Sequence, residues 1–262
     1  MGDRPVVLIT GASSGIGYAT ALAFARHGTH VVGTARRAER LAKLQQEISA
    51  LPGDHGEFLA VVADVRDADA MKEVVRRAME HFGRLDILVA NAGVGQRGAL
   101  VDSDWQDIET LLRTNIDGVL HSVSAAVPAM RQGNRGGHII LVSSVVYNII
   151  APYTAVYAAS KAFVHSIGRS LRLELTADHI HVTEMIIGRT RSEFNEKRLG
   201  RPGRSTKGFP PSMPVERVAE AIVKAARSRK KRITLRWIDR LILLGNRIAP
   251  ELVGRKAMKQ YK

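Results

Sequence analysis

The residues best suited to chemistry lie in the segment Tyr157-Ala158-Ala159-Ser160-Lys161. The segment falls in a stretch from Val156 to Leu175 with helical character, and residues four apart share one face of a helix. The Lys161 ammonium is therefore expected beside the Tyr157 phenol. A neighbouring cation lowers the phenol pKa from its reference value of about 10, which suits the pair to general acid–base catalysis. Such pairs also occur on solvated helix faces, so the flanking motifs decide between the two interpretations.

Two serines stand at the end of the apolar run from His138 to Val142, which is typical of a β-strand. In open α/β sheets, ligands bind at the carboxyl ends of the strands. Ser143 and Ser144 are therefore expected to lie at a ligand site.

A glycine-rich turn lies between an apolar run of strand length, Val6 to Thr10, and a helical pattern that stops at Gly28. The backbone N–H groups of such a turn and the positive end of the helix dipole face an anion, so this unit predicts a phosphate site. The spacing from Gly11 to Gly17 is G-x-x-x-G-x-G and not the commoner G-x-G-x-x-G. A tight connection without a ligand is the alternative.

The second predicted strand, His30 to Ala35, ends in Arg36-Arg37. In dinucleotide-binding folds, an acidic residue at this point binds the ribose 2′-hydroxyl, whereas an arginine accommodates a 2′-phosphate. The chain has Arg36 and no acid here, so NADP(H) is favoured over NAD(H). Two exposed arginines that merely open a charged helix are the alternative.

Strands and helices alternate along the chain at the interval of βαβ units, which predicts a parallel sheet with helices on both faces. We expect a single α/β domain, a doubly wound Rossmann sheet of about seven strands over residues 1–235. The tail, residues 236–262, would belong to the same domain or form an interface. Further strands are expected at Phe58–Ala63, Leu85–Ala90, His181–Ile187 and Ile233–Leu235, and helices at Ala38–Ala50, Ala68–Phe82, Trp105–Met130, Tyr153–Thr176 and Val215–Ser228.

Two segments interrupt this alternation. The residues from Asn115 to Gly118 are poor helix formers inside a long helical stretch, which indicates a kink or a working side chain. The basic loop at about 189–214 is longer than a simple connection requires and is expected to be a lid over the substrate.

The 262 residues contain no cysteine, which excludes a disulfide framework, a thiol nucleophile and a cysteine-ligated metal. No metal site is expected. No uninterrupted apolar run approaches the roughly 18 residues of a membrane span, and the first residues do not form a signal-peptide pattern. We therefore expect a soluble, cytoplasmic protein.

The formal net charge of +14 comes partly from the tail. A solvated basic surface that attracts phosphorylated cofactors is the favoured explanation, and no nucleic acid partner is expected. The tail also carries apolar residues at helical spacing beside arginines. Such a helix either makes peripheral contact with an anionic bilayer or packs on the protein's own core or a sister subunit. Its apolar residues are Trp237, Leu241, Leu244 and Ile248, and its arginines are Arg236, Arg240 and Arg247.

Five motifs follow one another along the chain: Thr10-Gly11-Ala12-Ser13-Ser14-Gly15-Ile16-Gly17, Asn91-Ala92-Gly93, Asn115, Ser144 and Tyr157-x-x-x-Lys161. In order and spacing, including the thirteen residues from Ser144 to Tyr157, they resemble the short-chain dehydrogenase/reductase family. The resemblance extends from about Val6 to Phe194 and points to the compact branch of that family.

The resemblance implies an NADP(H)-dependent carbonyl reductase or alcohol dehydrogenase. In that family's mechanism, Tyr157 would protonate the carbonyl oxygen in reduction and act as the base in oxidation, with its pKa lowered by Lys161. Lys161 would also hold the nicotinamide ribose, Ser144 would hydrogen-bond the substrate oxygen, and Asn115 would anchor a water that connects Lys161 to solvent. The cofactor would contact Gly11, Ser13, Ser14, Gly15, Ile16, Gly17, Arg36, Arg37, Asp64, Val65, Asn91, Ala92, Gly93, Tyr157, Lys161, Gly188 and Ser192.

The chain departs from the family pattern after its sixth predicted strand. Ile187-Gly188 replaces the usual Pro-Gly, which implies a less rigid loop. Ser192 replaces a threonine that contacts the nicotinamide amide, but the hydroxyl is kept, so cofactor binding is expected to survive.

The substrate pocket is expected between Val94–Arg97, Val145–Tyr153 and Arg189–Pro211. Family members commonly form dimers or tetramers, so a homodimer or homotetramer is implied. The alternative function is a cofactor-binding sensor or scaffold without turnover. A hydrophobic carbonyl substrate is favoured by the apolar side chains of Val145, Val146, Ile149, Ile150 and Tyr153.

Overall fold

One parallel β-sheet organises the structure, a computed structural model that describes residues 4–200 and 210–258. The sheet strands are β1 (Val6–Thr10), β2 (His30–Ala35), β3 (Phe58–Val62), β4 (Ile87–Ala90), β6 (Gly137–Ser144), β7 (Ile180–Ile187) and β9 (Arg232–Thr234). The helices are α1 (Gly15–Arg26), α2 (Ala38–Ser49), α3 (Ala68–Phe82), α4 (Trp105–Leu112), α5 (Gly118–Gln132), α6 (Ala155–Glu174), α7 (Val215–Ser228), α8 (Trp237–Ile248) and α9 (Pro250–Met258).

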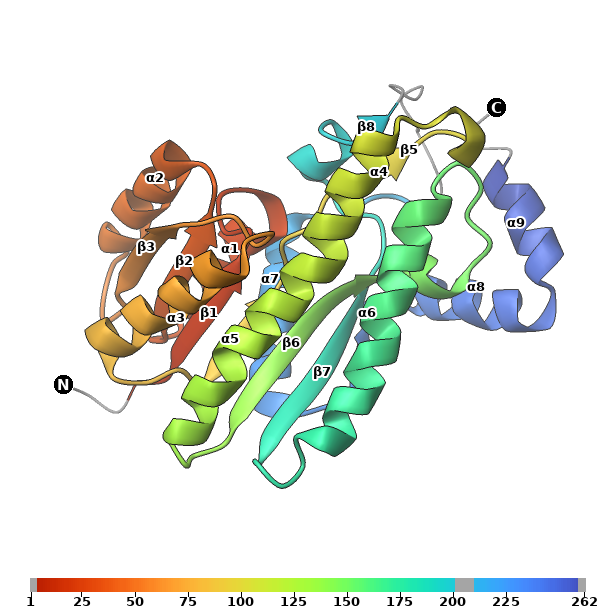
Figure 1. The fold of residues 1–262 in the computed structure, drawn as a ribbon. Coiled ribbons are helices and arrows are strands. Elements are labelled where there is room, and N and C mark those ends of the chain that lie inside the picture. The colour runs from red at the N-terminus through yellow and green to blue at the C-terminus, as the bar shows by residue number, and fades with distance from the viewer. Residues whose placement is uncertain (1–3, 201–209, 259–262) are drawn as a thin grey trace.

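Within the described residues the sheet has seven strands in the order β3-β2-β1-β4-β6-β7-β9 (Figure 1). Every neighbouring pair is parallel. The chain therefore winds outward in two directions from β1 and β4, and a crevice for ligands forms where the strand order reverses. The predicted single-domain, doubly wound α/β fold is confirmed.

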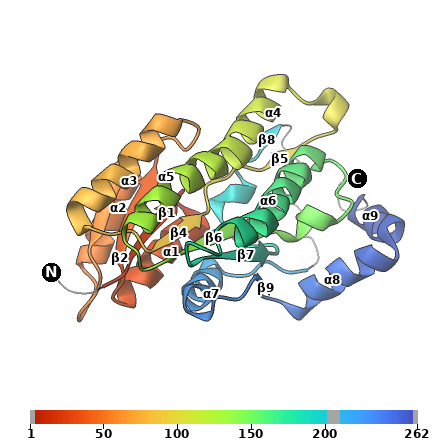
Figure 2. The same cartoon turned by 60° about the horizontal axis from the view of Figure 1, so that its bottom comes forward.

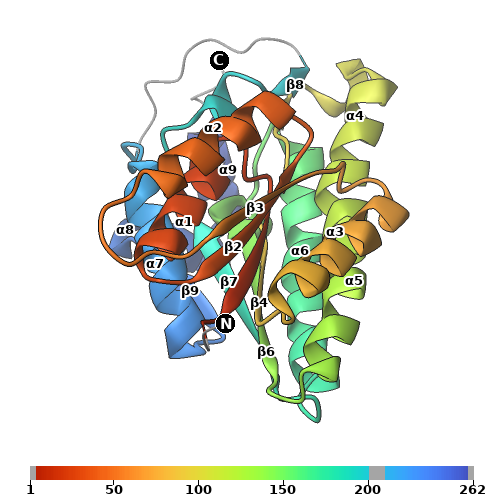
Figure 3. The same ribbon diagram turned by 90° about the vertical axis from the view of Figure 1, so that its left-hand side faces the viewer.

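Helices cover both faces of the sheet (Figure 3). Helices α3, α5 and α6 contribute to one buried apolar cluster and α1, α2 and α7 to the other. Within β1, Val6 and Leu8 belong to the first cluster, whereas Val7 and Ile9 belong to the second. A central parallel strand is buried on both faces, which explains why its sequence is continuously apolar.

The predicted helix from Trp105 to Met130 is interrupted, as its sequence indicated. Helix α4 ends at Leu112, a π-helix follows at Arg113–Asp117, and α5 then begins. Gly118 is required at this junction, because an added Cβ would lie 2.7 Å from a methyl carbon of Val65. The interruption thus sets α5 close against the loop after β3.

Other boundaries differ from the predictions. Helix α6 starts at Ala155 and not at Tyr153, whose φ of +60° lies in the left-handed region. The last strand begins one residue early, and the tail forms two helices instead of one. A two-residue pair, β5 (Gln96–Arg97) with β8 (Leu199–Gly200), was not predicted. Strands this short carry no readable alternation.

The tail helices lie beyond the β9 edge of the sheet, beside the loop between β6 and α6 (Figures 1 and 2). The predicted lid, 189–214, contains a short helical turn at Glu193–Asn195 and then β8, while residues 201–209 lie outside the described ranges. Among the helices described, none is both long and apolar enough to cross a membrane.

Candidate active site

A cavity of about 570 Å³ opens where the sheet order reverses. Its walls come from the glycine-rich turn, the carboxyl ends of the strands and the loop after β7. Of the residues predicted for the site, Gly17 and Asn115 are not on the cavity wall. Those that line the cavity are Gly11, Ser13, Ser14, Gly15, Ile16, Arg36, Arg37, Asp64, Val65, Asn91, Ala92, Gly93, Ser144, Tyr157, Lys161, Gly188 and Ser192.

Tyr157 and Lys161 lie close together on this wall. Both lie on α6, and the Lys161 Nζ atom is 5.9 Å from the centroid of the Tyr157 ring. Lys161 is buried, and its ammonium donates a 3.0 Å hydrogen bond to the backbone oxygen of Val142 on β6. The helix places both groups on one face, as the four-residue spacing predicted.

The electrostatics of this pair differ from the expectation. Burial raises the pKa of the Tyr157 phenol, and a hydrogen bond with Ser144 and the charge of Arg198 offset only part of that effect. Burial also lowers the pKa of Lys161 to about 8. The expected lowering of the Tyr157 pKa by Lys161 is therefore wrong for this structure, because desolvation of the phenolate outweighs the favourable charges.

The two serines at the end of β6 have different environments. Ser144 lies beside Tyr157 and caps the short helical turn after the strand, with its oxygen 3.5 Å from the Val146 nitrogen. Ser143 also borders the cavity but is almost fully buried, and its hydroxyl has no hydrogen-bond partner among the described residues. Ser144 is thus the serine that pairs with the tyrosine.

Asn115 lies in the π-helix, fully buried behind the cavity wall. Its amide nitrogen donates to the Val94 oxygen at 3.0 Å and to the Ser160 hydroxyl at 3.1 Å. Its amide oxygen accepts from the Val94 nitrogen at 2.8 Å. Asn115 therefore links the loop after β4 to α6 at Ser160, the residue that precedes Lys161.

The glycine-rich turn leads directly into α1. The Ser14 side chain makes no capping bond to the helix, so it leaves the N–H groups of the first turn uncapped, and Ser14, Gly15 and Ile16 line the cavity. A side chain on Gly17 would collide with the Gly11 carbonyl oxygen, so the turn stays close-packed only with glycine. The bare N–H groups and the helix dipole fit a cofactor phosphate.

The two arginines after β2 have different positions. Arg37 donates to the Ser13 hydroxyl at 2.9 Å and to the Ser14 hydroxyl at 2.8 Å, so it braces the glycine-rich turn. The Arg36 side chain is 61% exposed at the cavity rim, with Nη1 3.9 Å from the carboxylate of Asp64. Arg36 therefore remains available to an anion, whereas the Arg37 donors are partly engaged.

Asp64, predicted to contact the cofactor, is held by Arg66, whose Nε donates to it at 2.9 Å. Partial burial acts to raise the pKa of Asp64, but hydrogen bonds from Arg66 and the nearby charges bring that pKa below its ordinary value. The carboxylate therefore stays charged at this end of the cavity.

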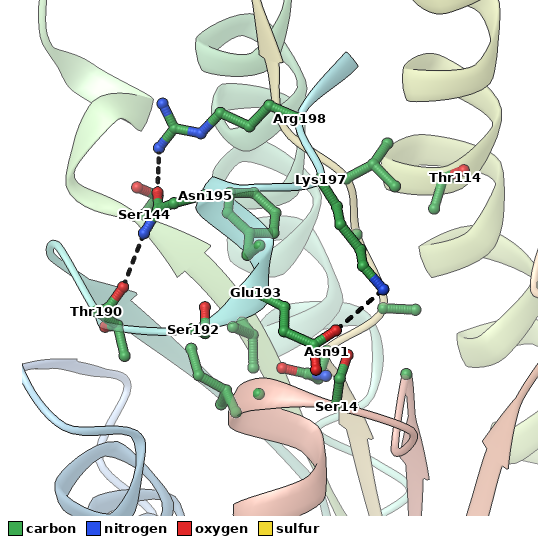
Figure 4. Close-up of a pocket in the computed structure, with 18 of the residues that line it drawn as sticks. Ser14, Asn91, Thr114, Ser144, Thr190, Ser192, Glu193, Asn195, Lys197 and Arg198 are labelled. Carbon is green, nitrogen blue, oxygen red and sulfur yellow. Dashed lines mark hydrogen bonds and ion pairs between the residues drawn. The ribbon is translucent and has the colours of Figure 1, made fainter. Parts of the chain in front are cut away.

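Glu193, from the loop after β7, was not predicted as a site residue. Its carboxylate lies 2.6 Å from Arg40, 3.0 Å from Lys197 and 3.6 Å from Arg37. Hydrogen bonds from Arg40 and Lys197 lower the pKa of Glu193 to about 2. A carboxylate of the protein itself thus lies among cations on the cavity wall, and Figure 4 shows its ion pair with Lys197.

The same loop covers the reactive end. The Phe194 ring lies 5.8 Å, centroid to centroid, from the ring of Tyr157. Ser192 lies over the glycine-rich turn, 3.2 Å from where a Cβ on Gly15 would be. Asn195 donates to the Thr190 oxygen at 3.0 Å and accepts from Arg198, which holds the loop in shape (Figure 4). The described part of the predicted lid therefore forms part of the cavity wall.

Gly188, where the family usually has glycine after proline, touches an ion pair from the tail. Any side chain there would collide with Arg236 and Asp239. The Arg236 guanidinium contacts the fully buried Asp239 carboxylate at 2.6 and 2.7 Å and also donates to the Pro211 oxygen. The loop after β7, which has Ile187 where the family usually has proline, is thus held in place by the first turn of α8.

The predicted apolar wall is smaller than expected. Val145 and Val146 line the cavity, but Ile149, Ile150 and Tyr153 do not. Ile150 lies instead against Gly254 of α9, where an added Cβ would be 2.7 Å from its Cγ2 atom. Tertiary packing directs this part of the loop toward the tail.

Comparison with known proteins identifies the family. Residues 5–201 match the family described as short chain dehydrogenase. The chain belongs to this family. As a short-chain dehydrogenase it is an oxidoreductase, and the family match ends before α7 and the tail helices.

Individual proteins that are similar to this chain support the same family assignment. Sulfoacetaldehyde reductase 2 of Chromohalobacter salexigens is 37% identical over 196 residues, which are 74% of this chain and 76% of the relative. The alcohol dehydrogenase of the archaeon Thermococcus sibiricus, solved with 5-hydroxy-NADP, has a TM-score of 0.78 and 27% identity, with 90% of this chain and 98% of that chain covered.

A short-chain dehydrogenase of Burkholderia phymatum, solved with NAD, shares the fold at a TM-score of 0.85 and 24% identity, with 95% of each chain covered. Structures of this fold therefore hold either nucleotide, and the choice between them depends on the residues of each chain.

Proposed function

We propose that this short-chain dehydrogenase is an NADP(H)-dependent carbonyl reductase or alcohol dehydrogenase that acts on an apolar carbonyl or secondary alcohol. The observation that carries the proposal is the pairing of Tyr157 with Ser144 and Lys161 in the cavity that also contains the glycine-rich turn. Family members commonly act as homodimers or homotetramers, and we extend that expectation to this chain.

The chain's own groups support proton transfer at one oxygen. The bound nicotinamide supplies or accepts the hydride. The raised pKa of Tyr157 keeps the phenol protonated at neutral pH, so it donates a proton to the substrate oxygen in reduction. The Ser144 hydroxyl donates a hydrogen bond to the same oxygen as negative charge develops there.

Lys161 and Asn115 support this reaction from behind the wall. Lys161, with its pKa lowered to about 8, carries an exchangeable proton near neutral pH. Asn115 acts as a positioning residue, because both N–H groups of its amide are bound to Val94 and Ser160. One acceptor position on its oxygen remains for the water that the family mechanism places there.

The nucleotide preference rests on Arg36. The cavity rim at the end of β2 is basic, and the exposed Arg36 guanidinium is suited to a 2′-phosphate. Arg36→Asp is expected to weaken NADPH binding while NADH binding is retained or improved. An unchanged ratio of the two affinities would count against the contact.

The reaction is tested by mixing the protein with NADPH and a panel of apolar ketones and aldehydes while following nicotinamide absorbance. Tyr157→Phe is expected to reduce turnover by at least about a hundredfold with little change in NADPH affinity. Tyr147→Phe is a matched control, since that hydroxyl bonds Arg232 outside the cavity. Tight NADPH binding without turnover of any carbonyl by the unmodified protein would favour the sensor alternative.

A further inference from the structure

The tail helices expose an apolar surface, which we call the tail stripe: Trp237, Leu241, Leu244, Ile248 and Leu252. The exposed fraction of these residues runs from 52% at Leu241 to 77% at Ile248. The first four recur every three or four residues along α8, so they lie on one helix face, and Leu252 is a further exposed apolar residue on α9. Exposed large apolar residues gathered in this way mark an interaction surface.

The opposite side of α8 holds the tail to the protein. Asp239 is buried in its pair with Arg236, and the Asn246 side chain bonds the Asn148 oxygen at 2.6 Å and the Ile150 nitrogen at 3.3 Å. Helix α8 is therefore packed on the protein through its polar side, and the tail stripe is exposed although the helix is firmly attached. The sequence left three partners open for these side chains: a bilayer, the protein's own core or a sister subunit. Packing on the protein's own core is wrong, because they are exposed.

Positive charge surrounds the tail stripe. Arg240, Arg247, Arg255 and Lys256 are exposed on α8 and α9, and in the described residues none of them forms an ion pair with a carboxylate. Glu251 is the exposed acid among the described residues of these helices. The sequence continues with two more lysines, Lys259 and Lys262.

This charge distinguishes between possible partners. In a two-fold contact between copies of the chain, the same patch would face itself, so arginines would oppose arginines with one acid per copy to offset them. An anionic bilayer complements both features, because apolar side chains enter the boundary of the acyl chains while cations bind lipid head groups. Tryptophan is enriched at that boundary, and interfacial helices carry lysine and arginine on their polar faces.

We propose that the tail stripe and its flanking cations dock the protein on an anionic lipid bilayer. Docking would bring the bilayer near two loops that border the cavity, because the start and the last turn of α8 are bonded to residues of these loops that lie outside the cavity wall. One is the loop after β6, bonded through Asn246, and the other is the lid, bonded through Arg236 to Pro211. That consequence rests on the proposed function, since an apolar carbonyl would partition into the bilayer.

Co-sedimentation of the full chain with phosphatidylcholine vesicles, with and without phosphatidylserine, tests the docking. We expect binding to the anionic vesicles that weakens as salt rises. Replacement of Arg247, Arg255 and Lys256 by Gln should weaken it about a hundredfold, because each cation near an anionic surface contributes about a factor of five.

The apolar contribution is tested separately. A variant with Leu241, Leu244 and Ile248 changed to Ser should lose vesicle binding while it keeps turnover of a water-soluble carbonyl. The matched control changes Val101 and Leu173 to Ser, which are 91% and 81% exposed elsewhere on the surface. With Trp105→Phe as background, the fluorescence of Trp237 should shift to the blue on anionic vesicles only.

Three results would overturn the proposal: no binding to either vesicle, equal binding to both, or equal loss in the Val101 and Leu173 control. Self-association that needs the tail stripe, without vesicle binding, would also overturn it and assign the surface to a second copy of the chain. The binding assays need no turnover, so failure of the proposed reaction and failure of the docking are separate outcomes.

Discussion

Lys161 is expected to destabilise the folded protein at neutral pH, and replacing it by Met tests this directly. The buried ammonium has a pKa lowered from the ordinary 10.5 to about 8. Each pKa unit corresponds to about 1.36 kcal/mol, so the buried charge costs the folded state about 3 kcal/mol. Met would remove that charge, but the Val142 oxygen would lose its donor, which costs about 1 kcal/mol. The net expectation for Lys161→Met at pH 7 is a gain of about 2 kcal/mol in the free energy of unfolding.

The dependence on pH follows from the sign of the shift. Below about pH 8 the lysine is protonated in both the folded and the unfolded chain, so the folded state carries the full penalty. Between about 8 and 10.5 the unfolded chain binds more protons than the folded one, and the stability contributed by this group therefore rises with pH. Above that range both states are neutral at this position, and the advantage of Met disappears.

Urea unfolding of the natural chain and of Lys161→Met, measured from pH 7 to pH 10, gives the difference between the two unfolding free energies. We expect the difference to shrink as pH rises, while the variant loses turnover. The same substitution at the exposed Lys43 of α2 is the matched control and should change stability little. A variant that is less stable at pH 7, or a difference that does not vary with pH, would refute the reasoning.

Three other perturbations have expected outcomes. Glu193→Gln removes a carboxylate from the basic end of the cavity, so NADPH and NADH, which share the pyrophosphate, should both bind more tightly in titration calorimetry. Unchanged affinity for both nucleotides would contradict this. Asp239→Asn leaves Arg236 buried beside an uncharged amide and should lower the free energy of unfolding by about 3 kcal/mol. The control Asp69→Asn, in an exposed pair, should have a barely measurable effect. Similar losses of stability in the two variants would exclude a special role for the buried pair. Asn115→Ala should lower kcat with little change in the KM for NADPH. It should also lower the free energy of unfolding by about 2 kcal/mol, because the groups that Asn115 binds lose their partner. A variant with the same kcat as the natural chain would contradict the positioning role.

The order of elements and most of the cavity wall could be predicted because their signals are local. Four-residue spacing on a helix placed Lys161 beside Tyr157, and an apolar run followed by glycines placed a bare helix end at the carboxyl end of β1. A strand end also delivered Ser144. Each of these arrangements is fixed by backbone geometry over a few residues.

Tertiary structure decided the contacts between segments far apart in the chain. Glu193 meets Arg40 across 153 residues, and nothing in the sequence around either residue marks the pair. Whether the pKa of Tyr157 is raised or lowered also depended on the fold, because all the segments that surround the phenol together determine how deeply it is buried.

The sequence by itself determined the sheet, the helices and the residues that meet at the strand ends, since hydrophobic period and glycine spacing act within single elements. It did not determine which side of α8 faces solvent. The apolar residues of that helix satisfy the same pattern whether they point inward or outward, and the buried pair of Arg236 and Asp239 fixed the choice by turning the polar side inward. A helical period defines a face, but only the packing of the folded chain defines what that face meets.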